Sequence, residues 1–85
     1  MKEFKFTITD TDGIHARPAG EFVKAAKAFE SNVSIAKGGK SVDAKKIFGV
    51  MGLAAKQGDI VTVTVDGADE GEAASALEEF MKKNL

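Results

Sequence analysis

The spacing of apolar and polar residues changes several times along this 85-residue chain, and each change predicts a new element. From Lys2 to Thr9 the two kinds of residue alternate, which is typical of a half-buried β-strand. From Pro18 to Phe29 the apolar residues recur at helical spacing, so we expect an amphipathic helix that ends around Glu30-Ser31-Asn32. The residues expected to share an apolar face are Phe4, Phe6 and Ile8 in the strand and Ala19, Phe22, Val23, Ala26 and Phe29 in the helix.

Two further strands are expected after this helix. Val33 and Ile35 form one face of the first, and Lys40 to Asp43 forms a shorter second strand with Val42 facing inward. The pair Gly38-Gly39 between them is a strong hairpin signal.

A short helix is predicted from Ala44 to Leu53, with Asp43 or Ala44 near its start. Its apolar residues wrap much of the helix circumference, which is too many for a single stripe facing the core. These residues are Ile47, Phe48, Val50, Met51 and Leu53. We expect two of these residues, Val50 and Leu53, to be buried.

A fourth strand and a last helix complete the pattern. Ile60 to Val65 is rich in β-branched residues, and Asp69 to Leu85 has acidic residues in its first turn and lysines in its last, as the helix macrodipole favours. The predicted order is βαββαβα. Four amphipathic strands with the helices collected on one side make a single α+β domain over residues 1–85, an open-faced sandwich.

Composition argues against several classes of function. With 12 basic and 13 acidic side chains the formal net charge is −1, which does not suit nucleic-acid binding. The absence of cysteine and the single histidine argue against disulfides and zinc, so we expect no metal. No apolar run approaches membrane-spanning length, and the first residues lack a signal-peptide pattern, so we expect a cytoplasmic protein without a membrane partner.

The run Gly13-Ile14-His15-Ala16-Arg17-Pro18 contains the only histidine, arginine and proline of the chain. Proline fits the first turn of a helix, so a helix should begin at about Ala16 to Pro18, with His15 at or just before its N-terminus. Free backbone N–H groups and the positive end of the helix dipole make that end an anion site. Arg17 adds a cationic fork suited to phosphate oxygens.

This arrangement suggests a histidine that carries a phosphoryl group. The backbone N–H groups of Ala16 and Arg17 are the expected donors to the phosphate, while Gly13 and Pro18 shape the loop and the helix start. His15 must be neutral when it attacks phosphorus, and we expect it to be open to solvent rather than in a deep pocket. A lone histidine is more often a surface or capping residue. The order glycine, apolar residue, histidine, any residue, arginine and proline at the start of a strongly patterned helix favours a functional residue here.

Three stretches of the chain carry a resemblance to a known family. They are Gly13 to Ala19, Asn32 to Met51 and Gly67 to Glu70. Through them the chain resembles, over essentially its whole length, HPr, the histidine-containing phosphocarrier proteins of the bacterial phosphoenolpyruvate:sugar phosphotransferase system. The family fold is βαββαβα with a four-stranded antiparallel sheet and three helices on one face.

The resemblance implies a carrier of phosphoryl groups rather than an enzyme. Enzyme I would pass a phosphoryl group from phosphoenolpyruvate to Nδ1 of His15, and the IIA domains of sugar permeases would receive it. No cofactor is implied, and we expect a monomer. A regulatory relative in a signalling or nitrogen-linked phosphorelay is the alternative, whereas an RNA-binding sheet is disfavoured because the strands lack paired aromatic residues.

Two neighbouring elements would form the docking surface for these partners. The first is a basic stripe on one face of the predicted helix, with a flat gap at its glycine: Arg17, Gly20, Lys24 and Lys27. The second is an apolar patch rimmed by lysines: Ile47, Phe48 and Met51 with Lys45 and Lys46. The alternative for the stripe is an ordinary solvated helix face.

The chain departs from the family at Lys46, which stands where many members carry a regulatory serine at the start of the short helix. Phosphorylation at that position is therefore impossible here, and regulation by a serine kinase is put in doubt. A cation at a helix N-terminus also costs about 0.3–1 kcal/mol. We therefore expect Lys46 to strengthen docking to acidic partners.

Overall fold

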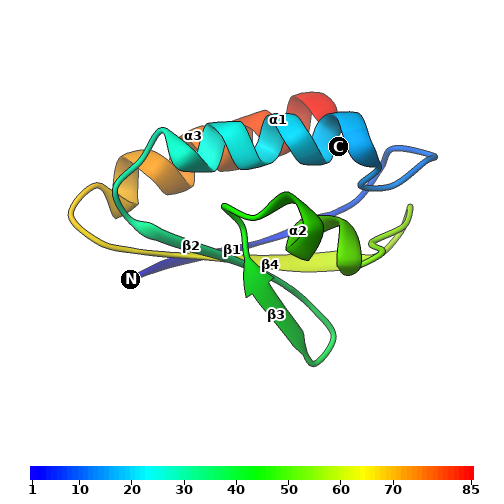
Figure 1. Ribbon diagram of the computed structural model, residues 1–85, viewed down its shortest axis with the longest axis horizontal. Helices are drawn as coiled ribbons and strands as arrows, with labels where there is room; N and C mark the ends of the chain where they lie inside the picture. Colours follow the sequence, from blue (N-terminus) through cyan, green and yellow to red (C-terminus); the bar gives the residue numbers. More distant parts are fainter.

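The computed structural model describes residues 1–85 and confirms the predicted order of strands and helices (Figure 1). The strands are β1 (Lys2–Thr7), β2 (Asn32–Lys37), β3 (Lys40–Asp43) and β4 (Ile60–Asp66). The helices are α1 (Ala16–Lys27), α2 (Ile47–Gly52) and α3 (Glu70–Asn84). The sheet forms one layer and the helices form the other, which is the predicted open-faced sandwich.

The sheet has the strand order β1-β4-β2-β3, and every neighbouring pair is antiparallel. β4 lies inside the sheet, where Val63 pairs with Phe4 of β1 on one side and with Ile35 of β2 on the other. The inward-facing valines of β4, Val61, Val63 and Val65, are all fully buried. The alternation in the sequence therefore specifies the register, because a shift by one residue would turn these side chains to solvent.

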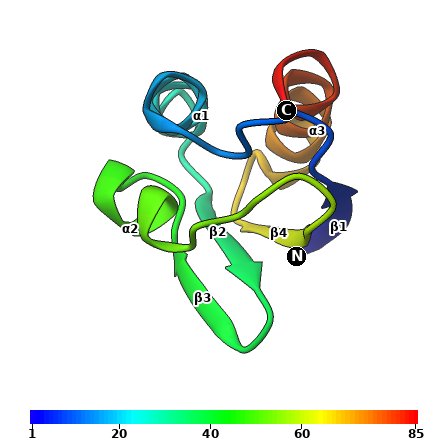
Figure 2. The same cartoon turned by 90° about the vertical axis from the view of Figure 1, so that its right-hand side faces the viewer.

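The helices α1 and α3 lie side by side over the apolar face of the sheet, and α2 lies beside α1 (Figure 2). Phe22 of α1 is fully buried, and its ring centroid lies 6.1 Å from that of Phe80 of α3. The buried apolar side chains of both helices and the sheet form one cluster. None of the helices has the length and apolar character needed to cross a membrane.

The boundaries of all three helices differ from the prediction, those of α3 by one residue at each end; β1 ends at Thr7 rather than Thr9, and β4 ends at Asp66 rather than Val65. α1 ends at Lys27 rather than at Phe29, because the N–H groups of Ala28 and Phe29 bond to carbonyls three residues back (both 3.2 Å) and close the last turn. α2 begins at Ile47 rather than at Asp43 or Ala44, and it ends at Gly52 rather than at Leu53.

The residues before α2 form a turn for a local reason. The Asp43 side chain accepts the N–H of Lys45 (2.8 Å), and the N–H of Ala44 donates to the carbonyl of Val33 in β2 (2.9 Å). An aspartate that binds the backbone two residues further on competes with helix formation. The turn therefore holds buried Ala44 against the sheet and delays the helix until Ile47.

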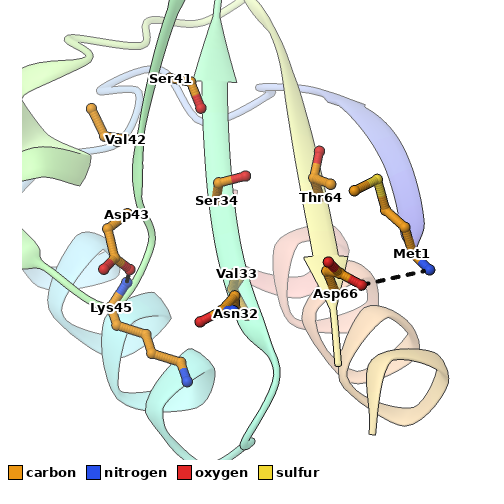
Figure 3. A pocket seen from close by; sticks show the side chains of 10 residues that line it. All are labelled: Met1, Asn32, Val33, Ser34, Ser41, Val42, Asp43, Lys45, Thr64 and Asp66. Atoms are coloured by element: carbon orange, nitrogen blue, oxygen red, sulfur yellow. Dashed lines mark hydrogen bonds and ion pairs between the residues drawn. The ribbon is translucent and has the colours of Figure 1, made fainter. Parts of the chain in front are cut away.

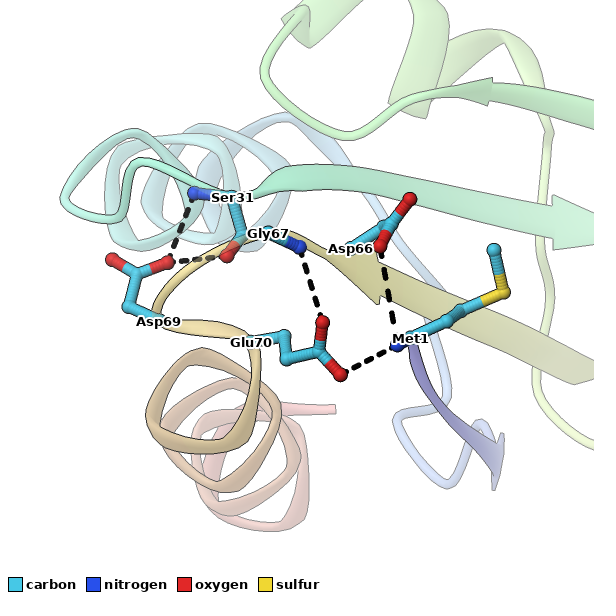
Figure 4. Close-up of polar contacts among 6 residues, drawn as sticks. All are labelled: Met1, Ser31, Asp66, Gly67, Asp69 and Glu70. Atoms are coloured by element: carbon cyan, nitrogen blue, oxygen red, sulfur yellow. Dashed lines mark hydrogen bonds and ion pairs between the residues drawn. The ribbon is translucent and has the colours of Figure 1, made fainter.

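A polar cluster joins the start of α3 to the loop between α1 and β2 (Figure 4). The Asp69 carboxylate accepts the Ser31 hydroxyl and the N–H groups of Glu30 and Ser31 (both 2.9 Å). The Ser31 hydroxyl is the main reason that the pKa of Asp69 lies below its usual range. Beside it, Glu70 accepts the amine of Met1 (2.6 Å), which is the main cause that lowers the pKa of Glu70.

Candidate functional site

The loop that carries His15 is fastened to the segment after α2. The N–H of Ile14 donates to the carbonyl of Ala55 (3.0 Å), and the Ile14 side chain is buried. Gly13 has a φ of 66°, and a Cβ at this position would lie 2.2 Å from the Ala55 oxygen. Only glycine therefore permits this close approach, which agrees with the structural function expected for Gly13.

His15 lies directly before α1, as predicted. Its backbone is extended (φ −96°, ψ −177°), and its carbonyl accepts the N–H of Ala19 (2.9 Å). The N–H groups of Ala16 and Arg17 have no hydrogen-bond partner within the protein, and Pro18 has no N–H to offer. The His15 side chain is exposed, so two free backbone donors and an accessible imidazole occur together at the helix start.

Arg17 lines the same shallow hollow as His15, but its side chain is paired with Glu21. Its side chain is 87% exposed, and its Nε lies 3.9 Å from Oε1 of Glu21, one helical turn further on. The guanidinium would have to leave Glu21 in order to bind a phosphoryl group on His15. Such an exposed pair is worth only about 0.3–0.5 kcal/mol, so this rearrangement is inexpensive.

Three carboxylates lie near His15 that the sequence analysis did not connect with it, those of Asp10, Asp12 and Glu21. One imidazole nitrogen and one carboxylate oxygen each of Asp10 and Asp12 lie within 4.8 Å of one another. His15, Arg17 and Pro18 also line a shallow hollow of about 290 Å³ with Asp10, Glu21 and Asn84. Asp10, Asp12 and His15 are of ligand types that a divalent ion uses, but they are surface groups, and the expectation of no metal stays a prediction.

Leu85, the residue directly after α3, contacts the segment that leads to His15. The main-chain oxygen of Leu85 accepts the N–H groups of Thr9 (2.6 Å) and Asp10 (2.8 Å) and the Thr9 hydroxyl (3.0 Å). The Leu85 side chain is buried, so this contact is anchored in the core. In Figure 2 the C-terminus accordingly lies at the end of α3, beside the loop between β1 and α1. A spacing of more than seventy residues gives no local signal for such a contact.

The predicted docking residues are brought together where α2 packs beside α1. A Cβ on Gly20 would lie 3.5 Å from Cδ1 of Ile47, so the gap in α1 receives this side chain. Phe48 is 87% exposed and Met51 38%, whereas Val50 and Leu53 are buried as expected. The lysines that are exposed around this surface are Lys24, Lys27 and Lys46.

Lys45 does not stand free at the edge of the apolar patch of Ile47, Phe48 and Met51. Its ammonium donates to the carbonyl of Phe29 (2.9 Å), and the residue is half-buried. Lys46 is exposed and is the residue directly before α2, with extended backbone (φ −121°, ψ 115°). The expectation for the rim is therefore wrong for Lys45, while Lys46 has the position expected for it.

The largest hollow of the molecule lies elsewhere. It has a volume of about 460 Å³ and is lined by residues of β2, β3 and β4 together with Met1 and Lys45 (Figure 3). Ser34, Ser41 and Thr64 are among its lining residues, and it contains no histidine. The exposed imidazole with free backbone donors, rather than this open sheet face, is therefore the candidate site.

The fold and this site define a class: a small open-faced α+β domain that presents a histidine at a helix N-terminus. Comparison with known proteins agrees with this class. The family model for the PTS HPr component phosphorylation site matches residues 2–83. The chain belongs to this family, the HPr phosphocarrier proteins of the phosphotransferase system.

Individual relatives support the same assignment. The phosphocarrier protein HPr of Haemophilus influenzae is 47% identical over 70 residues, which cover 82% of each chain. That of Xylella fastidiosa is 42% identical over 85 residues, or 100% of this chain and 96% of the relative. A crystal structure of HPr from Thermoanaerobacter tengcongensis superposes with a TM-score of 0.94 at 40% identity and covers 99% of this chain and 94% of its own. An HPr dimer from the same organism is also similar, with a TM-score of 0.78 at 41% identity, covering 98% and 95%.

Proposed function

We propose that this protein accepts a phosphoryl group from phosphorylated enzyme I on His15 and passes it to IIA domains of sugar permeases. The observation that carries the proposal is the exposed imidazole of His15 beside the free N–H groups of Ala16 and Arg17, in a chain of the HPr family. Free donors at a helix N-terminus bind the oxygens of an anion without any metal. The protein then acts as a carrier and has no turnover of its own.

The transfer requires a neutral imidazole. A ring nitrogen of His15, Nδ1 in this proposal, uses its lone pair to bond phosphorus while the bond from the donor to phosphorus breaks and the donor keeps that electron pair. The negative oxygens then lie near the N–H groups of Ala16 and Arg17. Because the site is a shallow surface, a partner can approach the phosphoryl group directly for the next transfer.

The partners would dock on the surface formed by α1 and α2. Exposed Phe48 and Met51 supply an apolar centre, with Ile47 filling the gap at Gly20, and the exposed lysines supply a positive rim. This mixture of a small apolar centre and a charged rim is typical of transient complexes. Enzyme I and IIA domains would then present acidic surfaces around their phosphoryl sites. We further propose that the protein works as a monomer in the cytoplasm.

The proposal is tested by incubating the protein with phosphoenolpyruvate and enzyme I. We expect phosphate that is labile to acid and stable to base, and its complete loss in His15→Ala, with circular dichroism confirming that the variant is folded. Addition of a sugar-specific IIA domain should then remove the label. A protein that gains no label is not a carrier, and a label that no sugar IIA domain removes would favour the regulatory alternative.

A further inference from the structure

Negative side chains lie where a negative group is expected to arrive. Asp10 and Asp12 each place a carboxylate oxygen within 4.8 Å of an imidazole nitrogen of His15. Glu21 lines the hollow beside His15 and lies 3.9 Å from Nε of Arg17, the cation expected to bind phosphate. None of these carboxylates can donate a hydrogen bond to a phosphoryl oxygen while it is ionised. Their presence at the acceptor therefore needs a different explanation.

We propose that Asp10, Asp12 and Glu21 weaken the hold of His15 on its phosphoryl group and so favour onward transfer. This inference rests on the proposed function and deepens it. Asp10 and Asp12 would act through like-charge repulsion, which is strongest at short range. Glu21 would act through Arg17, because a guanidinium paired with Glu21 is less available to the phosphate.

The three carboxylates take no part in the bond changes. When the phosphoryl group moves, one N–P bond to His15 forms, the bond to the donor breaks with its electron pair left on the donor, and the other imidazole nitrogen keeps its proton. The charge of the phosphoryl group travels with it. Repulsion from Asp10 and Asp12 therefore exists only while His15 is phosphorylated, and it is relieved by transfer to the next protein.

The expected effect is moderate because the groups are near the surface. For charges a few ångströms apart in a mostly aqueous setting, each aspartate should lower the equilibrium phosphorylation of His15 about threefold. The exposed pair of Glu21 with Arg17 should contribute about twofold. A moderate equilibrium constant for phosphorylation of His15 suits a carrier, since the carrier must accept the phosphoryl group from one partner and release it to another.

The test is a competition for phosphate between two forms of the whole chain. Isotope-labelled unmodified protein and an unlabelled variant are mixed with catalytic enzyme I and limiting phosphoenolpyruvate until the distribution is constant. Intact-mass spectrometry at neutral pH then gives the ratio of phosphorylated to free protein for each form. Because both forms share one donor, the quotient of the two ratios is the relative equilibrium constant and does not depend on the rate of transfer.

The variants remove charge with little change of shape. Asp10→Asn keeps an oxygen that can accept the N–H of Asp12, now 2.8 Å from Oδ1 of Asp10. At position 12 we choose Asp12→Gln rather than Asp12→Asn. Asparagine before Gly13 would readily deamidate and restore a carboxylate. Glu21→Gln removes the partner of Arg17, and Glu72→Gln is the control, an exposed carboxylate in the first turn of α3, the end opposite Asn84.

We expect Asp10→Asn and Asp12→Gln each to hold about three times more phosphate than the unmodified chain, and Glu72→Gln to hold the same amount. The gain should shrink from 0.01 M to 1 M salt, where the screening length falls from about 30 Å to about 3 Å. The twofold gain of Glu21→Gln should disappear when Arg17 is also changed to Gln. This loss would show that Glu21 acts through Arg17.

Equal ratios for the aspartate variants and the control would overturn the inference, while phosphate on His15 would leave the proposed function intact. Absence of phosphate from the unmodified chain would contradict the proposed function itself. The experiment is repeated at two Mg²⁺ concentrations. If the aspartate variants hold less phosphate, and increasingly so with Mg²⁺, repulsion is wrong and the carboxylates instead bind a cation with the phosphoryl oxygens.

Discussion

Replacement of Gly13 by alanine tests whether the contact between the His15 loop and the segment after α2 holds the site in place. A Cβ at residue 13 would meet two backbone atoms, the oxygen of Ala55 at 2.2 Å and Cα of Lys56 at 2.9 Å. Backbone atoms cannot rotate away as a flexible side chain can. The substitution must therefore push the loop off Ala55 and break the hydrogen bond from the N–H of Ile14.

Two contributions set the size of the effect. Alanine in the left-handed region, at a φ of 66°, costs about 1–2 kcal/mol. Loss of the hydrogen bond at buried Ile14 adds about 1–3 kcal/mol if its N–H stays without a partner. We therefore expect a loss of about 3 kcal/mol in the free energy of unfolding, which corresponds to a fall in Tm of about 12–24 °C for a domain of this size.

Gly38→Ala is the matched control. Gly38 has a similar φ of 60°, but a Cβ there would meet nothing within 4 Å. This variant should lose only the backbone contribution, about 1–2 kcal/mol. Urea unfolding of both variants, followed by circular dichroism, gives the difference directly. Equal losses in the free energy of unfolding for the two variants would refute the argument that the Ala55 contact fastens the His15 loop. If Gly13→Ala accepts phosphate at an unchanged rate, this contact is not important for the site.

Four other changes probe the remaining parts of the structure. Ala54→Gly should stabilise the protein by about 0.5–1 kcal/mol in urea unfolding, because Ala54 has a positive φ of 52°; a loss of stability would contradict this. The Ser31 hydroxyl lowers the pKa of Asp69 in the folded protein. The stability that ionised Asp69 contributes is therefore present above its unfolded pKa of about 3.9 and is lost as pH falls through the folded pKa. In an acid titration, Asp69→Asn should lose less stability below pH ~4 than the unmodified chain. Phe48→Ala should change the free energy of unfolding by less than about 0.5 kcal/mol, since Phe48 is 87% exposed, yet weaken enzyme I binding about tenfold in calorimetry. Lys46→Ser and Lys46→Glu should weaken binding to enzyme I and IIA domains, most at low salt, and unchanged affinities across salt would exclude Lys46 from the interface.

The sequence alone was sufficient for the order of the elements and for the position of His15 directly before a helix. Strand and helix periods differ strongly between Lys2–Thr9 and Pro18–Phe29, so the type of each element follows from local spacing. Pro18 likewise marks the start of α1, because a proline is tolerated in the first turn of a helix. These two local rules place His15 at a helix N-terminus without any knowledge of the rest of the chain.

Tertiary structure decided the features that depend on contacts between distant residues. The start of α2 moved to Ile47 because, besides the local turn at Asp43, the N–H of Ala44 is held by the Val33 carbonyl of β2. The ammonium of Lys45 bonds to the Phe29 carbonyl instead of standing free at the edge of the predicted docking surface. Neither contact follows from helical or strand periodicity, since each depends on which carbonyl lies nearby in the folded chain.

The surroundings of His15 show the same division. Its position before α1 was determined by local sequence, whereas its neighbours were determined by folding, which brings Leu85 to Thr9 and Asn84 to the hollow beside the imidazole. The spacing of four residues between Arg17 and Glu21 is a local signal for their pairing, and the alternative of a solvated helix face already included an exposed Arg17. Local sequence thus placed His15 at the start of a helix, and long-range packing determined the charges around it, because charges act through space rather than along the chain.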